Sequence, residues 1–275
     1  MIPFTKAHAC GNDFLIITED AAAGTDWAEL ARTLCARNTS IGADGIEFFR
    51  WTGEKAGRIR LHNADGSVAE ISGNGTRCVA AWMAESLGSK PGDVLEIATD
   101  AGLRRCRIEA IGGHSVQVVS GMGVPSFRPR VVQLADGTQV AGAEVSTGNP
   151  HFVIVTDHAD FAVQGRPWQA VGAEICVHPD FPRQTNVEFL RVIQMAEAPN
   201  EIEIRIFERG VGPTTSSGTG SSAAATAAIA QSLVHSPVRV VAPGGAQIVA
   251  WGGTGTELSL TGPASLIARG QAWIR

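Results

Sequence analysis

Two stretches of this chain share one short pattern: residues 64–75 read ADGSVAEISGNG, and residues 208–220 read ERGVGPTTSSGTG. In each, a Ser-Gly-polar-Gly segment, at Ser72 and at Ser217, opens an alanine-rich stretch with the composition of a helix. The two serines lie 145 residues apart (217 − 72), which is about half of the chain. The sequence therefore predicts an internal duplication, in which each half contains one helix that begins at a glycine-rich turn.

Strand patterns surround both predicted helices. Residues 58–62 and 201–207 alternate polar and apolar side chains, as half-buried strands do, and residues 12–18 form a short apolar run. Residues 136–137 and 243–245 are typical of hairpin turns. Further strands are expected over 46–50, 94–99, 103–110, 115–120, 130–134, 151–156, 186–194, 237–241, 246–250 and 256–260. Helices are expected over 27–35, 74–87, 167–177 and 218–233.

These elements predict an α+β fold with two pseudo-symmetric domains. Each domain is expected to be a curled, mainly antiparallel sheet around a central helix, with the two helix N-termini facing a cleft between the domains. Residues 121–129 are rich in glycine and proline, so a domain boundary is expected there. The N-terminal half is then 1–120 and the C-terminal half 121–264, and a last strand over 265–275 is expected to return to the first half.

Composition narrows the class of protein. The chain has 275 residues, 44% of them hydrophobic, and a net charge of −5, which gives no reason to expect nucleic acid or an acidic membrane as a partner. No apolar stretch approaches the roughly 20 residues that span a bilayer, and residues 1–12 do not resemble a secretory signal. We therefore expect a cytoplasmic protein.

Cysteine and lysine usage bears on cofactors. The five cysteines are odd in number and form no C-x-x-C pair, which favours reduced thiols over a structural zinc site. Only three lysines are present, Lys6, Lys55 and Lys90, which lowers the chance of a pyridoxal Schiff base. We expect no metal and no cofactor.

The repeated motif has a physical meaning. A glycine-rich turn that leads into a helix exposes several backbone N–H groups at the positive end of the helix dipole, and such a terminus binds carboxylate or phosphate. For one isolated Ser-Gly-x-Gly segment, a serine N-cap would be the simpler interpretation. Two such segments indicate two anion-binding helix starts, which could hold one α-carboxylate from both sides.

The whole chain resembles the diaminopimelate epimerase family. The matching segments are residues 11–14 (GNDF), 42–45 (GADG), 63–67 (NADGS), 73–78 (GNGTRC), 148–151 (GNPH), 185–189 (TNVEF), 208–212 (ERGVG) and 218–220 (GTG). The resemblance implies a cofactor-independent amino-acid epimerase, most simply one that interconverts LL- and meso-diaminopimelate for lysine and peptidoglycan synthesis. In that family two cysteines act from opposite faces of the α-carbon, and helix N-termini stabilise the charge that develops on the carboxylate.

The resemblance also assigns roles to single residues. Ser72 and Ser217 stand where the family has its two cysteines, and His151 and Glu208 match the supporting acid–base pair. The residues matched to substrate binding are Asn63, Asn149, Asn186 and Arg209 for the far end of the substrate, Asn12 near the reacting carbon, and Gly73, Asn74, Gly218 and Thr219 for the α-carboxylate. The expected partner is a small amino acid, and a homodimer is left open.

The two serines change the chemistry. A thiol has a pKa near 8.5, and a helix N-terminus lowers it further, whereas an alcohol is a far weaker acid. Serines are therefore poor proton-transfer groups unless a neighbouring base activates them. His151 and Glu208 are the candidate bases, and Cys10, beside the loop that carries Asn12, is a minor candidate for a substitute thiol.

Several explanations of the serines stay open at this point. They could be deliberate Cys→Ser changes, but Pro213, Ser216 and Ser221 depart from the family pattern as well, which favours a natural serine variant. A second interpretation is an isomerase or dehydratase of the same fold that uses Glu208 or His151 as its base. A third is a homologue that binds an amino acid and has little activity.

Overall fold

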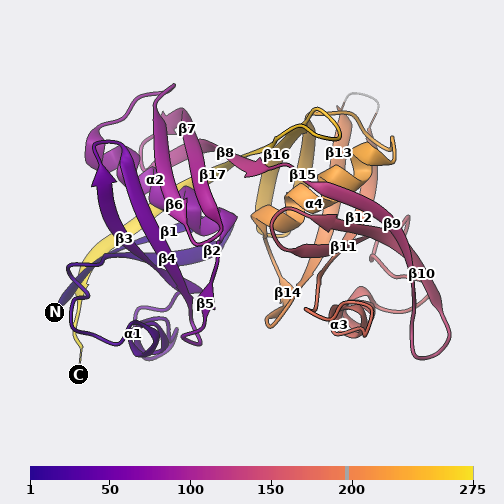
Figure 1. Ribbon diagram of the computed structural model, residues 1–275, viewed down its shortest axis with the longest axis horizontal. Coiled ribbons are helices and arrows are strands. Elements are labelled where there is room, and N and C mark those ends of the chain that lie inside the picture. The colour runs from indigo at the N-terminus through magenta and orange to yellow at the C-terminus, as the bar shows by residue number, and fades with distance from the viewer. Residues whose placement is uncertain (196–197, 275) are drawn as a thin grey trace. The chain divides into compact units, whose positions relative to one another are not determined.

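The computed structural model describes residues 1–195 and 198–274, and the chain forms two compact units (Figure 1). Unit 1 comprises Met1–Ser120 together with Thr261–Arg275, and unit 2 comprises Gly121–Leu260. The end of the chain thus belongs to the unit that contains its beginning.

Unit 1 contains two helices and most of its strands in chain order: β1 (Ile2–Ala9), β2 (Asn12–Thr18), α1 (Trp27–Leu34), β3 (Gly45–Gly53), β4 (Ala56–Asn63), β5 (Val68–Ala69), α2 (Gly73–Leu87), β6 (Val94–Thr99), β7 (Gly102–Gly112) and β8 (Ser115–Gly123). Unit 2 follows with β9 (Ser126–Gln133), β10 (Gln139–Ser146), β11 (Pro150–Val155), α3 (Trp168–Cys176), β12 (Asn186–Met195), β13 (Ala198–Glu208), β14 (Gly212–Thr214), α4 (Gly218–Ala230), β15 (Val238–Ala242) and β16 (Gly245–Trp251). Two strands cross between the units. The last three residues of β8 belong to unit 2, and the strand β17 (Leu258–Ala272) begins in unit 2 and ends in unit 1.

The two units repeat one pattern of strand pairing. In unit 1, β1–β2 is antiparallel, β2–β3 parallel, β3–β4 antiparallel, β4–β6 parallel and β6–β7 antiparallel. In unit 2 the same series runs β10–β11, β11–β12, β12–β13, β13–β15 and β15–β16. The shared series confirms the two-domain α+β fold with pseudo-symmetric halves that the duplicated motif predicts.

The central helix of each unit is buried. Figure 1 shows strands of the same unit around α2 and around α4. Every residue of α4 from Gly218 to Ala228 is buried, and its alanines pack against isoleucines of β13. In α2 every residue from Gly73 to Ala81 is buried. Alanine and glycine allow strands to approach a helix closely on all sides, which explains the unusual composition of these two segments.

Each unit has a second helix outside its central core. Asp26 caps α1, because its side chain accepts hydrogen bonds from the backbone of Ala28 and Glu29 at 2.9 and 3.1 Å. Leu30 and Leu34 of α1 lie in a separate core cluster. Among the described residues, none of the helices is long and apolar enough to cross a membrane.

The expected strands and helices match observed ones, and four observed strands were not expected: β1, β10 and the short strands β5 and β14. The pattern misses β1, in which Pro3 and Lys6 interrupt the apolar residues, and β10, in which alanine and glycine give weak strand propensity. The last helix ends at Ala230 rather than at residue 233, because the backbone of Ser232 has a positive φ of 58°.

The alanine packing of α4 gives a stability prediction. Ala224→Leu adds three carbon atoms at a fully buried position of a close-packed helix, so we expect a loss of about 1–3 kcal/mol or more in the free energy of unfolding. Ile229→Leu, at the partly buried end of the same helix, is the control and is expected to cost under about 1.5 kcal/mol. Urea unfolding of the two variants and the parent measures both. An equal loss in the two variants would contradict this account of α4.

Candidate active site

In unit 1 the repeated motif forms the N-terminus of α2. Ser72 is the N-cap residue, with an extended backbone and an Oγ that accepts a hydrogen bond from the Gly75 N–H at 3.0 Å. Its carbonyl oxygen accepts from the Thr76 N–H at 2.8 Å and so starts the helical ladder. The first turn of such a helix has N–H groups that are not used by the ladder, and they are suited to an anion.

A chain of polar contacts fixes the side chains beside this turn. The buried Arg77 donates to Asn74 Oδ1, and the Asn74 amide nitrogen donates to Asn12 Oδ1 at 3.2 Å. The Asn12 amide in turn donates to Asp44, which also pairs with Arg37 at 2.6 Å. Charged residues at the two ends of this chain thus fix the orientation of both amides. The structure brings the predicted residues Asn12, Gly73 and Asn74 together at the start of α2.

Asp13 connects this chain of contacts to the loop before β3. It pairs with Lys6 at 3.0 Å and with Arg37 at 2.7 Å. Burial alone would raise the pKa of the Asp13 carboxyl, but hydrogen bonds from Arg37 and Lys6 outweigh it and lower the pKa. Asp13 therefore stays charged and holds the Asn12 loop against the sheet.

Asn63 has a different local role in unit 1. Its amide donates to Ser67 Oγ at 3.0 Å, and its backbone N–H donates to the Ser67 carbonyl at 2.8 Å. Asp65 accepts from the same Ser67 at 2.6 Å. Asn63 thus closes the turn that leads to Ser72. Its contact with a ligand stays a prediction.

In unit 2 the motif forms the N-terminus of α4 in the same way. Ser217 is the N-cap, its Oγ accepts from the Gly220 N–H at 3.2 Å, and its carbonyl accepts from the Ser221 N–H at 2.9 Å. The Ser217 and Thr219 hydroxyls lie 3.4 Å apart. The predicted trio Ser217, Gly218 and Thr219 therefore forms one helix start, matched in geometry to the one at Ser72.

His151 belongs to the same unit and makes a fully buried contact with Glu188. Its Nδ1 is 2.7 Å from Glu188 Oε1, and its Nε2 is 2.9 Å from Asn149 Oδ1. Asn149 Oδ1 also accepts from the Thr147 hydroxyl at 3.3 Å, so His151 Nε2 is the donor of its bond. The proton between Nδ1 and Glu188 then belongs either to the imidazolium or to a carboxyl group.

Burial favours the protonated form of Glu188 in this pair. Desolvation raises the pKa of Glu188, and the His151 charge opposes that rise only in part. The carboxyl of Glu188 therefore holds its proton more strongly than an exposed glutamate does. The pair of His151 and Glu188 is a proton store with no exposed side-chain surface.

The other predicted residues of unit 2 lie where β13 ends. Glu208 is the last residue of β13 and is half-buried. The next residue, Arg209, donates its backbone N–H to Asn186 Oδ1 at 2.9 Å and its guanidinium to the Arg183 carbonyl at 2.9 Å. Asn186 and Arg209 are thus held together where β12 begins and β13 ends.

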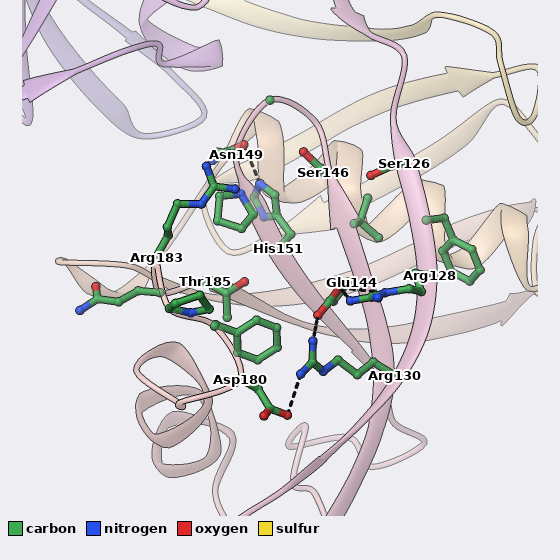
Figure 2. Close-up of a pocket in the computed structure, with 17 residues that line it drawn as sticks. Ser126, Arg128, Arg130, Glu144, Ser146, Asn149, His151, Asp180, Arg183 and Thr185 are labelled. Atoms are coloured by element: carbon green, nitrogen blue, oxygen red, sulfur yellow. Dashed lines mark hydrogen bonds and ion pairs between the residues drawn. The ribbon is translucent and has the colours of Figure 1, made fainter.

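A pocket of about 520 Å³ opens in unit 2 beside His151 (Figure 2). Asn149, His151 and Thr185 line one side of it, and the Arg183 side chain points toward Asn149 in Figure 2. The rest of the lining includes an ion-paired chain, in which Arg128 and Arg130 bind Glu144 and Arg130 also binds Asp180 at 2.8 Å. The pocket is therefore lined by polar and charged groups of both signs.

Two buried glutamates were not predicted from the sequence. Glu47 of β3 and Glu188 of β12 are both 0% exposed. They lie 25 and 29 residues before the two serines (72 − 47 and 217 − 188). Both interrupt apolar strand segments, GIEFF and NVEFL. A glutamate inside an apolar strand could have indicated these two positions, because a charged residue is rarely buried without a partner or a role.

The two glutamates occupy equivalent places. Glu47 pairs with Ile16 and Leu61 on its neighbouring strands, and Glu188 pairs with Val153 and Ile206 on the corresponding strands of unit 2. Each carboxyl lies against the second glycine of the motif. A Cβ added at Gly75 would overlap Glu47 Oε1, and one added at Gly220 would lie 2.8 Å from Glu188 Oε1.

The cysteines of the described chain are free and buried. Cys10 has a positive φ of 52° and an exposure of 4%, and it contacts the buried Arg77. Cys78 on α2 is a buried core residue, and this burial raises the pKa of its thiol. Among the described residues, no group of His, Cys, Asp and Glu side chains is placed to hold a metal ion.

Comparison with known proteins assigns the family. The model of the family described as diaminopimelate epimerase matches residues 4–128 and 144–267. The chain belongs to the diaminopimelate epimerase family. Diaminopimelate epimerase from Desulfitobacterium hafniense is 34% identical over 96% of both chains, and that from Pseudomonas aeruginosa is 33% identical over 98% of this chain and 99% of the relative. The resemblance read from the motifs is confirmed, and membership places the chain among isomerases of the epimerase and racemase class.

Solved structures agree on the fold of the family. A phenazine biosynthesis protein of the PhzF family from Bacillus anthracis has a TM-score of 0.73 at 15% identity, with 99% of both chains covered. A hydroxyproline epimerase from Agrobacterium vitis, solved with bound trans-4-hydroxy-L-proline, has a TM-score of 0.71 at 16% identity over 98% of this chain and 90% of the other. A methylitaconate-delta-isomerase has a TM-score of 0.62 at 13% identity over 98% and 94% of the two chains. At these identities the likeness concerns the fold.

Glu47 gives a pH-dependent stability prediction. Burial raises the pKa of its carboxyl to about 8 from 4.5, so the folded chain keeps a proton that the unfolded chain releases. Its contribution is most favourable below pH 4.5, and it falls by up to about 1.4 kcal/mol per pH unit as the pH rises toward 8. Glu47→Gln removes this dependence, so the stability of the variant relative to the parent should increase between about pH 5 and pH 8.

Urea unfolding at the two pH values measures the difference. The control is Glu29→Gln on the surface of α1, which removes an exposed carboxylate in place of a buried one. A relative stability of Glu47→Gln that stays constant between the two pH values would contradict the assignment of Glu47 as a buried, proton-holding carboxyl.

Proposed function

We propose that this protein epimerises an amino acid at its α-carbon without a cofactor, and that the substrate is LL- or meso-diaminopimelate in lysine and peptidoglycan synthesis. The observation that carries the proposal is the pair of serine-capped helix starts at Ser72 and Ser217, in a chain that belongs to the diaminopimelate epimerase family. The five cysteines are free and buried, which fits the reducing conditions of the cytoplasm.

The two helix starts are suited to an α-carboxylate. In the proposed complex the first-turn N–H groups at Gly73, Asn74, Gly218 and Thr219 bind the carboxylate of the substrate, and they stabilise the extra negative charge when the α-proton leaves. Asn12 lies beside the first of these turns through its bond to Asn74. This arrangement needs no imine to stabilise the carbanion.

The far end of diaminopimelate carries a second amino group and a second carboxylate. Arg209 with Asn186 at the end of β13, and Asn149 at the rim of the pocket, are the groups that we propose for this end, together with Asn63. A guanidinium binds a carboxylate through two parallel hydrogen bonds, and amide side chains supply both donors and acceptors. A substrate with one charged end would make no use of these groups.

In the proposed mechanism Ser72 and Ser217 act on opposite faces of one α-carbon, with Glu208 and His151 as supporting acid–base groups. A second candidate function keeps the fold and changes the chemistry. In that alternative the chain is an isomerase or dehydratase in which His151 with Glu188, or Glu208, is the only base. The fold similarity to methylitaconate-delta-isomerase and the buried His151–Glu188 pair favour it.

The first test is exchange of the α-proton. Incubation of LL-diaminopimelate with the protein in deuterated water should introduce deuterium at the α-carbon and produce the meso isomer, which mass spectrometry and chiral chromatography detect. Ser72→Ala and Ser217→Ala should each lower the exchange rate by about 10²-fold or more, since each removes one proton-transfer group. Exchange that survives both alanine variants but is lost in Glu208→Gln or His151→Gln would instead favour the single-base isomerase.

Restoring the thiols is the second test. The double variant Ser72→Cys/Ser217→Cys should exchange the α-proton faster than the parent, because thiols at helix N-termini ionise near neutral pH. Absence of both binding and exchange with diaminopimelate in the parent and in this variant would rule out the proposed substrate. If only the cysteine variant were active, the parent would be an amino-acid-binding homologue with impaired chemistry.

The role of Arg209 gives a third test. Arg209→Gln should raise KM for diaminopimelate by roughly 10-fold to 100-fold, since a charge-assisted bond contributes about 1.5–3 kcal/mol. The effect on kcat should be smaller, because the contact lies away from the reacting carbon. Arg183→Gln is a matched control at the pocket rim. Equal KM values for the parent and Arg209→Gln would exclude Arg209 from the substrate site.

A further inference from the structure

Each motif serine has a buried carboxyl group close behind it, on the inner side of the helix start. In unit 1, a Cβ added at Gly75 would overlap Glu47 Oε1 and would lie 3.2 Å from Ser72 Cβ. In unit 2, a Cβ added at Gly220 would lie 2.8 Å from Glu188 Oε1 and 3.4 Å from Ser217 Oγ. The absence of a side chain at these two glycines is what lets carboxyl and serine face the same small volume.

Glu47 lacks the partners that a buried carboxylate normally has. Neither of its side-chain oxygens has a hydrogen-bond partner among the described residues, and its neighbours in β3 are Ile46 and Phe48. An unpaired polar group at such a position costs free energy compared with an apolar side chain of similar size. The position therefore lowers stability and is better explained by chemistry than by packing.

The Ser72 hydroxyl can donate one further hydrogen bond. Its Oγ accepts the Gly75 N–H, which occupies one lone pair and leaves the hydroxyl proton for another acceptor. Ser72 Cβ and Glu47 Oε1 both border the position that a Gly75 Cβ would occupy. The described chain has no hydrogen bond between Ser72 and Glu47, so proton transfer requires the hydroxyl to turn toward the carboxyl. The N-cap hydroxyl and the buried carboxyl thus form a donor and an acceptor at one helix start.

We propose that Glu47 accepts the hydroxyl proton of Ser72 at the moment when Ser72 takes the α-proton of the substrate. This inference rests on the proposed epimerase function and adds to it the base that an alcohol needs. Glu47 acts through Ser72 and does not touch the substrate, so it is a positioning residue for the proton.

The proton transfers balance. The Cα–H bond breaks, its proton bonds to Ser72 Oγ, and the former hydroxyl proton moves to Glu47 in its ionised form, while the electron pair stays on the substrate as an enediolate. Because burial raises the pKa of Glu47 to about 8, the ionised form becomes populated as the pH rises toward 8, and the exchange rate should rise with it. On the other face Ser217 gives its hydroxyl proton to the α-carbon and regains one from the Glu188–His151 pair. The reverse reaction returns both protons. Nothing is oxidised or reduced.

The two faces differ in the number of protons they store. Glu47 has no imidazole partner, whereas Glu188 shares a proton with His151 at 2.7 Å. The Ser217 side can therefore hold one proton more than the Ser72 side. A chain with this arrangement carries its own proton acceptor and donor at once, as a two-base epimerase requires.

The proposal is tested by comparing the effect of Glu47→Gln in the parent with its effect in two cysteine variants. Glu47→Gln should lower the rate of α-proton exchange of LL-diaminopimelate by about 10²-fold in the parent. In the Ser72→Cys background the same change should matter by less than about threefold, because a thiol ionises without help. Ser217→Cys is the matched control background, in which Glu47→Gln should still cause the full loss because the thiol is on the wrong face.

Binding separates a chemical role from a structural one. The Kd for LL-diaminopimelate, measured by calorimetry, should agree between the parent and Glu47→Gln within about threefold, because Glu47 does not touch the substrate. The melting curves should show that both proteins fold. Equal losses of exchange in the parent and in the Ser72→Cys background would assign a structural role and overturn the proposal. No loss in either background would overturn it as well.

Failure of this inference differs from failure of the proposed function. If the parent is inactive and the Ser72→Cys/Ser217→Cys variant is active, the substrate assignment stands and Glu47 does not make Ser72 competent. If neither protein binds or exchanges diaminopimelate, the substrate assignment fails and this inference fails with it.

Discussion

Burial of a helix along nearly its whole first three turns is the constraint on which each unit depends. A sheet can surround a helix only if the side chains of that helix are small, which explains the run of alanines in α4 and the Gly-Asn-Gly start of α2. The same burial removes water from the first backbone N–H groups, which then need a partner. A serine side chain satisfies one of them, and the others are left suited to an anion. Packing and anion binding therefore have one physical origin in this fold.

Local patterns explain what could be predicted. The N-caps Ser72 and Ser217 and the alternating strands at 58–62 and 201–207 are properties of short segments, and their structure follows from those segments. The order of motifs pointed to the family. Contacts between distant segments could not be inferred in this way. The chain of contacts from Arg77 through Asn74 and Asn12 to Asp44 joins residues up to 65 positions apart (77 − 12), so only the folded sheet brings them together.

The two halves have diverged although their strand order is shared. The position that holds His151 in β11 corresponds by register to Phe14 in β2, because their neighbours Val153 and Ile16 pair with the two buried glutamates. One half thus has an imidazole beside its glutamate, and the other has an aromatic side chain at that place. Glu47 was not predicted because its burial depends on a distant segment. From the sequence alone, Glu47 is a polar residue on the outer face of a strand, and α2 buries it by covering that face.

The last strand makes the order of synthesis matter. Ile2 of β1 pairs with Ala272 of β17, and the series continues to His8 and Ser265. Strand β1 is synthesised long before β17, so this pairing of β1 forms only after β17 has been made. Unit 2 lies between these two partners in the chain and can finish most of its own sheet first. Unit 1 is thus expected to complete its folding after unit 2, and loss of the β17 residues that pair with β1 would destabilise unit 1.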